Sequence, residues 1–178
     1  MINAWGKSQR SKRTLSIRNP IAIPRTGSLL ALDLATVLGW ATLDADGKTE
    51  SGYHKLCGGS RPEKLAAYGR WLKDKLALQP SAVVYEAPVL PRLTRLETLT
   101  FLNGLVGITE MLCFERMLPV FQIHAQTARH VVLGNGRLKK TEIVKTIGYL
   151  FPGDMIKDHN QADALVLLEY ARAIRRQT

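Results

Sequence analysis

The sequence contains little cysteine and no long hydrophobic run. Its two cysteines, Cys57 and Cys113, lie far apart and lack the spacing of a metal-binding pair. We expect both to be buried as small hydrophobic residues in a reducing compartment. No apolar segment approaches the ~20 residues that a membrane span requires. The 178 residues therefore predict a soluble cytoplasmic protein with one folded domain.

Acidic residues are absent from residues 1–28. Six of the 25 Lys and Arg residues lie there, which leaves 19 basic and 15 acidic residues in the remainder of a chain with a net charge of +10. The segment has no hydrophobic period, so we expect residues 1–27 to be a basic, disordered tail and residues 28–178 to be the folded domain. An organellar targeting peptide is the alternative for the tail, which lacks the apolar stretch of a secretory signal. The positive charge of both parts predicts a polyanionic partner.

Hydrophobic patterns predict the order of strands and helices in the domain. Strands are expected at residues 29–35, on either side of the Asp46-Gly47 turn, at 81–88 and at 119–125. Helices are expected from Arg61 onward and at residues 94–118, 141–151 and 157–176. Three antiparallel strands followed by alternating helices and strands predict an α/β fold. Its five-stranded mixed sheet would be flanked by helices on both faces.

Three acidic residues stand at positions where hydrophobic residues are the rule. Asp33 interrupts the apolar first strand, Glu86 ends the fourth strand, and Asp163 lies on the core-facing stripe of the last helix. If the first and fourth strands are neighbours, these carboxylates meet at one edge of the sheet. Taken singly, each acid has another interpretation. Asp33 would cap a turn, Glu86 would be a surface acid, and Asp163 would be an exposed residue on a differently phased helix.

A cluster of three carboxylates predicts a metal site. Carboxylates a few ångströms apart repel one another unless a cation neutralises them. Hard oxygen ligands suit Mg²⁺ or Mn²⁺. Two such ions about 4 Å apart activate a water molecule and stabilise the leaving oxygen in phosphodiester hydrolysis. The cofactor we expect is therefore Mg²⁺ or Mn²⁺, with two ions in each active site.

The order of these motifs resembles RuvC-type Holliday junction resolvases, which belong to the ribonuclease H-like nucleases. The resemblance covers residues 29–173. The matching segments are "ALDLATVLGWA", "VVYEAP", "RHVVLGNGRLKK" and "NQADALVLL". The resemblance implies a ribonuclease H-like fold in which Asp33, Glu86 and Asp163 are the catalytic metal ligands.

A fourth metal ligand is left open by the sequence. The family has Asp or His three residues before the last aspartate, whereas this chain has Asn160 there, which is a poor ligand for a cation. His159 is the candidate one helical turn before Asp163, and Asp158 is a candidate if the helix begins after it. The alternatives are a helix N-cap for Asp158 and a surface imidazole for His159.

Basic residues and a hydrophobic helix indicate the partners. The resemblance places Arg129 and Lys140 near the scissile phosphate, and Arg137 and Lys139 would bind the DNA backbone beside them. A solvated basic face is the alternative. The helix at 94–118 is apolar on nearly every side, which suits either the twofold interface of a homodimer or a fully covered core helix.

These features together predict a structure-selective endonuclease that resolves Holliday junctions by paired, metal-dependent phosphodiester hydrolysis. Its partners would be branched DNA and a second copy of the chain, without a membrane or a small-molecule substrate. A bacterial or phage-encoded protein is expected, and an organellar one is the alternative. Two other functions are retained: a ribonuclease H-like nuclease acting on RNA or on branched DNA in general, and a junction-binding relative without catalysis.

Overall fold

The computed structural model describes residues 23–88, 95–152 and 156–176. Most of the predicted basic tail, residues 1–22, lies outside the described residues. Residues 23–27 are described, and Ile23 is buried in a hydrophobic core with 2% of its surface exposed. Packing of the chain therefore begins before residue 28.

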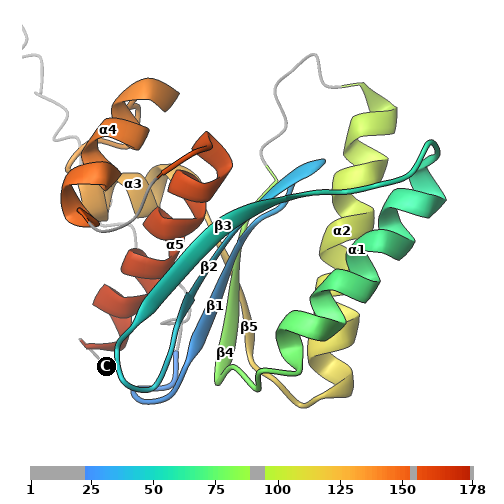
Figure 1. Ribbon diagram of the computed structural model, residues 1–178, viewed down its shortest axis with the longest axis horizontal. Helices are drawn as coiled ribbons and strands as arrows, with labels where there is room; N and C mark the ends of the chain where they lie inside the picture. Colours follow the sequence, from blue (N-terminus) through green and yellow to red (C-terminus); the bar gives the residue numbers. More distant parts are fainter. Residues whose placement is uncertain (1–22, 89–94, 153–155, 177–178) are drawn as a thin grey trace, which may run out of the picture.

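The strands of the described residues form one mixed sheet (Figure 1). They are β1 (Leu29–Asp33), β2 (Val37–Leu43), β3 (Thr49–Lys55), β4 (Ala82–Glu86) and β5 (Val120–Ile123). Their spatial order is β3-β2-β1-β4-β5. The β1–β2 and β2–β3 pairs are antiparallel, and the β1–β4 and β4–β5 pairs are parallel. The predicted five-stranded mixed sheet is confirmed, including the adjacency of the first and fourth strands.

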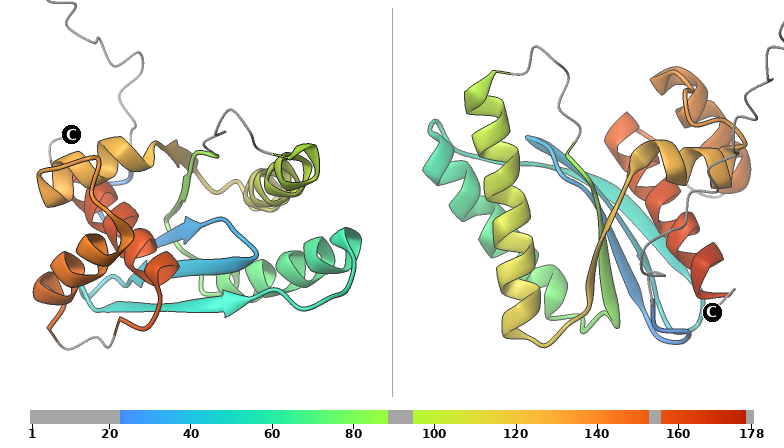
Figure 2. Two further views of the ribbon diagram at one scale, coloured as in Figure 1. Left: turned by 90° about the horizontal axis from the view of Figure 1, so that it is seen from above. Right: turned by 180° about the vertical axis from the view of Figure 1, so that it is seen from behind.

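Helices cover both faces of the sheet (Figure 2). On one face lie α1 (Arg61–Leu76) and α2 (Leu96–Glu115), and on the other lie α3 (Ala125–Leu133), α4 (Lys140–Leu150) and α5 (His159–Arg175). The sequence predicts four helices, whereas the described part of the chain contains five, so this prediction is wrong. The unpredicted helix is α3. Its last residue, Leu133, is followed by Gly134, whose φ of 75° is the left-handed conformation typical of the residue after a helix.

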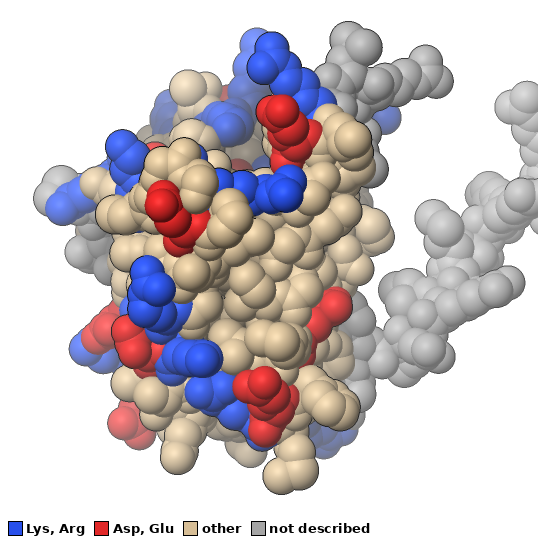
Figure 3. Space-filling model, turned by 90° about the vertical axis from the view of Figure 1, so that its right-hand side faces the viewer, with Lys and Arg blue, Asp and Glu red and all other residues tan. Residues whose placement is uncertain are grey.

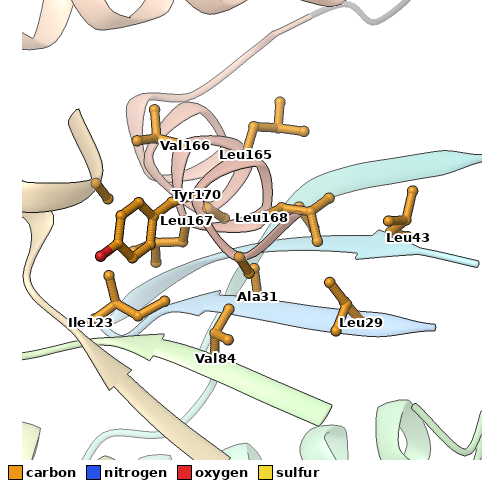
Figure 4. Packing of buried hydrophobic residues seen from close by; sticks show 14 of the residues in the cluster. Leu29, Ala31, Leu43, Val84, Ile123, Leu165, Val166, Leu167, Leu168 and Tyr170 are labelled. Carbon is orange, nitrogen blue, oxygen red and sulfur yellow. The ribbon is translucent and has the colours of Figure 1, made fainter. Parts of the chain in front are cut away.

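β1 is buried on both faces because its side chains alternate between two hydrophobic cores. Leu29 and Ala31 pack in the core under α5, whereas Leu30 and Leu32 pack with residues of α1 and α2. Figure 4 shows the core under α5, whose residues 165–168 lie over the sheet. The consequence for function is that the ends of β1 and the start of α5 are held in a close-packed frame.

Three local predictions are confirmed and one is wrong. The Asp46-Gly47 segment forms the turn between β2 and β3, and Gly47 has a φ of 87°. Helix α1 begins at Arg61 behind a capping box formed by Ser60 and Glu63. Cys113 is buried as predicted, but Cys57 is exposed because it lies in the segment between β3 and α1. None of the described helices has the length and hydrophobicity needed to cross a membrane.

Candidate active site

Two of the three predicted acids end neighbouring parallel strands. Leu32 of β1 is paired with Tyr85 of β4, and the next residue on each strand is Asp33 or Glu86. Because parallel strands present their carboxyl ends at the same edge of a sheet, both acids stand at that edge. The two side chains are close enough for the charge of Glu86 to raise the pKa of Asp33.

The third acid is brought to this edge by a close contact between α5 and β2. Gly39 is the β2 residue paired with Asp33. A Cβ atom on Gly39 would lie 1.8 Å from the carbonyl oxygen of Asn160 in the first turn of α5. The missing side chain therefore lets the helix backbone rest on the strand beside Asp33. Asp163 follows one turn later and is buried, with 6% of its surface exposed, so the alternative of an exposed helix residue is wrong.

A polar contact anchors the same end of α5 to the sheet. The Nε2 of Gln161 donates a hydrogen bond of 3.0 Å to the Oγ of Ser51 on β3. Its Oε1 accepts one of 3.0 Å from the backbone N–H of Lys157. The buried amide of Gln161 therefore fixes both the entry into the helix and its position across the sheet.

The pKa values of Asp33 and Glu86 are raised because the carboxyl groups are buried close to one another. Burial raises the pKa of Asp33 well above its ordinary value, and the negative charges of Glu86 and Asp163 raise it further. Burial, followed by the charge of Asp163, raises the pKa of Glu86 to about 7. The positive charges of Arg129 and Lys140 lower both pKa values. The cluster therefore needs positive charge to be fully ionised at neutral pH.

Asp163 has a partner that the sequence does not predict. Arg129 of α3 donates two hydrogen bonds to Oδ1 of Asp163, from Nε at 3.1 Å and from Nη2 at 2.7 Å. The side chains are 20% and 8% exposed, respectively, so solvent screens this ion pair only partly. The sequence places Arg129 among the DNA contacts, and no local pattern on α5 indicates it as the partner of Asp163.

The candidates for a fourth ligand lie at the beginning of α5. Asp158 is its N-cap, and its Oδ1 accepts a hydrogen bond of 2.7 Å from the backbone N–H of Asn160. The capping alternative for Asp158 is therefore confirmed. The Nδ1 of His159 is 3.9 Å from Oδ2 of Asp158. Both residues line an open groove that also contains Lys140 and Lys157, and a role for either of them with a metal stays a prediction.

The basic segment forms the connection between α3 and α4. Arg137, Lys139 and Lys140 are exposed. Gly136 allows the connection to fold against α3, since a Cβ atom there would lie 2.7 Å from the carbonyl oxygen of Gln126. Lys140, the first residue of α4, is near enough to Asp33 and Glu86 to lower their pKa values. At least one cation of this basic segment, Lys140, therefore borders the carboxylates.

The three carboxylates do not form a preassembled metal site. In residues 23–88, 95–152 and 156–176, no group of three or more His, Cys, Asp or Glu side chains is arranged to hold a metal ion. Asp163 is instead bound by Arg129. The donor chemistry nevertheless fits Mg²⁺ or Mn²⁺, because carboxylates from β1, β4 and α5 gather where positive charge is needed.

Among the comparisons with known proteins, the solved structures identify the fold. No protein-family model matches the chain, and no curated protein matches it. Among solved structures, RuvC from Thermus thermophilus is 17% identical with a TM-score of 0.65, covering 84% of this chain and 95% of that one. The same protein in complex with a Holliday junction substrate is 16% identical with a TM-score of 0.66 and has the same coverage. The yeast mitochondrial Holliday junction resolvase Ydc2 is 13% identical with a TM-score of 0.57, covering 86% of this chain and 80% of that one.

These likenesses define the class of fold. The chain has the ribonuclease H-like α/β fold, and within that class it has the arrangement of the RuvC-type resolvases. The predicted fold class and the predicted resemblance are confirmed at the level of the fold.

Proposed function

We propose that this protein is a structure-selective endonuclease that resolves Holliday junctions by paired, divalent-metal-dependent phosphodiester hydrolysis. The observation that carries the proposal is that Asp33 and Glu86 end neighbouring parallel strands, with Asp163 near enough for its charge to raise the pKa of both. Burying carboxylates this close together is costly for a protein that does not use them. The fold supports the same function, because its structural neighbours are Holliday junction resolvases.

The roles of the side chains follow from their charges and positions. Asp33, Glu86 and Asp163 would hold Mg²⁺ or Mn²⁺, with two ions in each site. When bound, such ions lower the pKa of a coordinated water and stabilise the leaving oxygen. Lys140 stands next to the carboxylates and would neutralise the reacting phosphate. Arg137 and Lys139, exposed beside it, would bind flanking phosphates of the DNA backbone.

Cleavage of a synthetic four-way junction tests this function. With Mg²⁺, we expect paired cuts in two opposed strands, resolved on a denaturing gel, and no cuts in EDTA. A linear duplex, a flap and an RNA–DNA hybrid of matched sequence should be cut far more slowly. Faster cutting of the hybrid or of the flap would instead assign the protein to another ribonuclease H-like nuclease function.

A second candidate is a junction-binding relative without catalysis. The ion pair between Arg129 and Asp163 favours it, because Arg129 already supplies a positive charge to this carboxylate. Tight junction binding without any cutting in Mn²⁺ would establish this candidate and exclude the first. Cutting in Mn²⁺ would exclude the second.

Two symmetric cuts need two active sites, so we propose a homodimer that associates through α2. This helix buries Leu105 and Leu112 but leaves large hydrophobic side chains exposed. The exposed ones are Leu96, Met111 and Phe114, and Met117 follows the helix. Figure 3 shows the side of the molecule with α1 and α2, where charged side chains surround a broad area without them. An exposed apolar surface of this kind is typical of an interface.

Substituting Phe114, which is 83% exposed, tests the interface. We expect the wild-type protein to sediment as a dimer at micromolar concentration. Phe114→Glu should be a folded monomer, because a dimer would have to bury two new carboxylates. Leu78→Glu is the matched control, since Leu78 is 70% exposed but follows α1, and it should remain dimeric. A dimeric Phe114→Glu variant would show that α2 is not the interface.

A further inference from the structure

The ion pair between Arg129 and Asp163 occupies one oxygen of a carboxylate that the proposed metal centre would use. Both hydrogen bonds from Arg129 end on Oδ1 of Asp163, at 3.1 and 2.7 Å. Asp163 is buried, and its carboxylate therefore has few ways to turn while it is held in this way. A guanidinium group and a divalent cation also repel each other at such short range. The binding of Arg129 to Asp163 and the binding of a metal ion to the same carboxylate therefore oppose each other.

A DNA phosphate is a second binding partner available to Arg129. It lies on α3, which leads directly into the connection that carries the exposed Arg137, Lys139 and Lys140. One fifth of its side-chain surface is already exposed. The planar fork of a guanidinium group matches a phosphate as well as a carboxylate. A DNA phosphate placed beside these cations therefore offers Arg129 a charged oxygen acceptor in place of Oδ1 of Asp163.

We infer that Arg129 is a positioning residue that couples metal binding to DNA binding, an inference that rests on the proposed function. In the DNA-free protein it neutralises Asp163 and competes with the divalent cation for this ligand. A bound DNA phosphate draws Arg129 away and releases Asp163 to the cation. Since linked equilibria are reciprocal, DNA raises the affinity for metal by the same factor as metal raises the affinity for DNA. The metal centre therefore assembles fully only on a bound substrate.

Calorimetric titration of the metal-free protein with Mn²⁺ tests the competition without using activity. Arg129→Gln removes the positive charge but keeps a side chain of polar character, and Arg129→Lys keeps the charge but loses the bidentate contact. We expect Arg129→Gln to bind Mn²⁺ about tenfold more tightly than the wild type, within the usual range of coupling between two sites. Arg129→Lys should lie between the two. Arg137→Gln is the matched control, because it removes a neighbouring exposed cation, and it should change the affinity by less than about twofold.

A double variant and a titration with DNA complete the test. Asp163→Asn combined with Arg129→Gln should lose the gain in Mn²⁺ affinity, because Asp163 is the ligand that the single variant releases. Junction DNA should raise the affinity of the wild type for Ca²⁺, measured on DNA shown to be uncut on a denaturing gel. The increase should be smaller in Arg129→Gln, in which no guanidinium has to move. Circular dichroism of each variant ensures that only folded proteins are compared.

The possible results separate this inference from the proposed function. Tighter Mn²⁺ binding by Arg129→Gln than by the wild type and by Arg137→Gln supports the inference, since a merely structural role of Arg129 would weaken binding. Unchanged or weaker binding by a folded Arg129→Gln variant overturns it, and Mg²⁺-dependent junction cutting by the wild type would then leave the proposed function intact. Failure of every variant to bind Mn²⁺ with or without DNA overturns both.

Discussion

Replacing Asp33 with asparagine is expected to reduce Mg²⁺-dependent junction cleavage by about a thousandfold or more, on the order of the cost of losing one preorganised charge in a transition state. The substitution keeps the size of the side chain and removes its capacity to carry a negative charge. Asp33 ends β1, and burial and the charges of Glu86 and Asp163 raise its pKa. Junction binding should persist, because it depends on the basic residues around the site. Single-turnover cleavage and fluorescence anisotropy measure the two quantities separately.

The control for this variant is Asp46→Asn. Asp46 is exposed in the turn between β2 and β3, and its substitution removes the same charge far from the carboxylate cluster. It should cleave at the wild-type rate. If Asp33→Asn cleaves at a rate close to that of Asp46→Asn, Asp33 has no part in catalysis.

The substitution Gly39→Ala is expected to destabilise the protein by about 3 kcal/mol, at the upper end of the usual cost of overpacking. The added methyl group would lie 1.8 Å from the carbonyl oxygen of Asn160, which is a backbone atom that cannot turn away. Either α5 moves off β2 or the strand bends. Both changes displace Asp163 from the end of β1, so cleavage should fall together with stability. Thermal unfolding should shift downward by roughly 10 °C for a domain of this size.

Gly107→Ala provides the matched control for this variant. Gly107 lies within α2, is exposed, and has no atom within 4 Å of the place where its Cβ would stand. Alanine favours a helix over glycine by up to about 1 kcal/mol. The control should therefore be as stable as the wild type or slightly more stable. An equally stable Gly39→Ala variant would contradict the close seating of α5 on β2.

The acids at the strand ends could be predicted because each one interrupts a strong pattern. Asp33 stands in an otherwise apolar run, and a strand buried on both faces has such a run. Glu86 is the last residue of another short apolar strand. Their adjacency required only that β1 and β4 be neighbours, a condition that the sequence left open and the structure meets. The fold and the location of these two acids could therefore be predicted from the sequence.

The partner of Asp163 could not be predicted from the sequence, for a physical reason. Arg129 is 34 residues away along the chain and lies on α3, a helix of nine residues that the sequence did not predict. Only Ala125 and Ala128 of this helix are buried, so its apolar stripe is too weak to stand out against a loop. A contact between two elements leaves no periodic signal on either one. The left-handed Gly134 after Leu133 was the one local sign that a helix ends there.

The sequence also leaves the role of Asp158, at the beginning of α5, undecided. An aspartate before a helix fits both an N-cap and a metal ligand, and the sequence does not separate the two interpretations. The hydrogen bond from the N–H of Asn160 to Oδ1 of Asp158 shows the capping role. His159 stands next to it, and its contact with Asp158 at 3.9 Å is too long for a hydrogen bond.

Anomalous scattering from a crystal of the protein with bound DNA, soaked with Mn²⁺, shows whether Asp33, Glu86 and Asp163 form one metal centre. We expect Mn²⁺ peaks within coordination distance, about 2.2 Å, of oxygens from all three side chains, with Arg129 turned toward a phosphate. Peaks bound elsewhere, or Asp163 still paired with Arg129 while Mn²⁺ occupies other ligands, would rule out this metal centre.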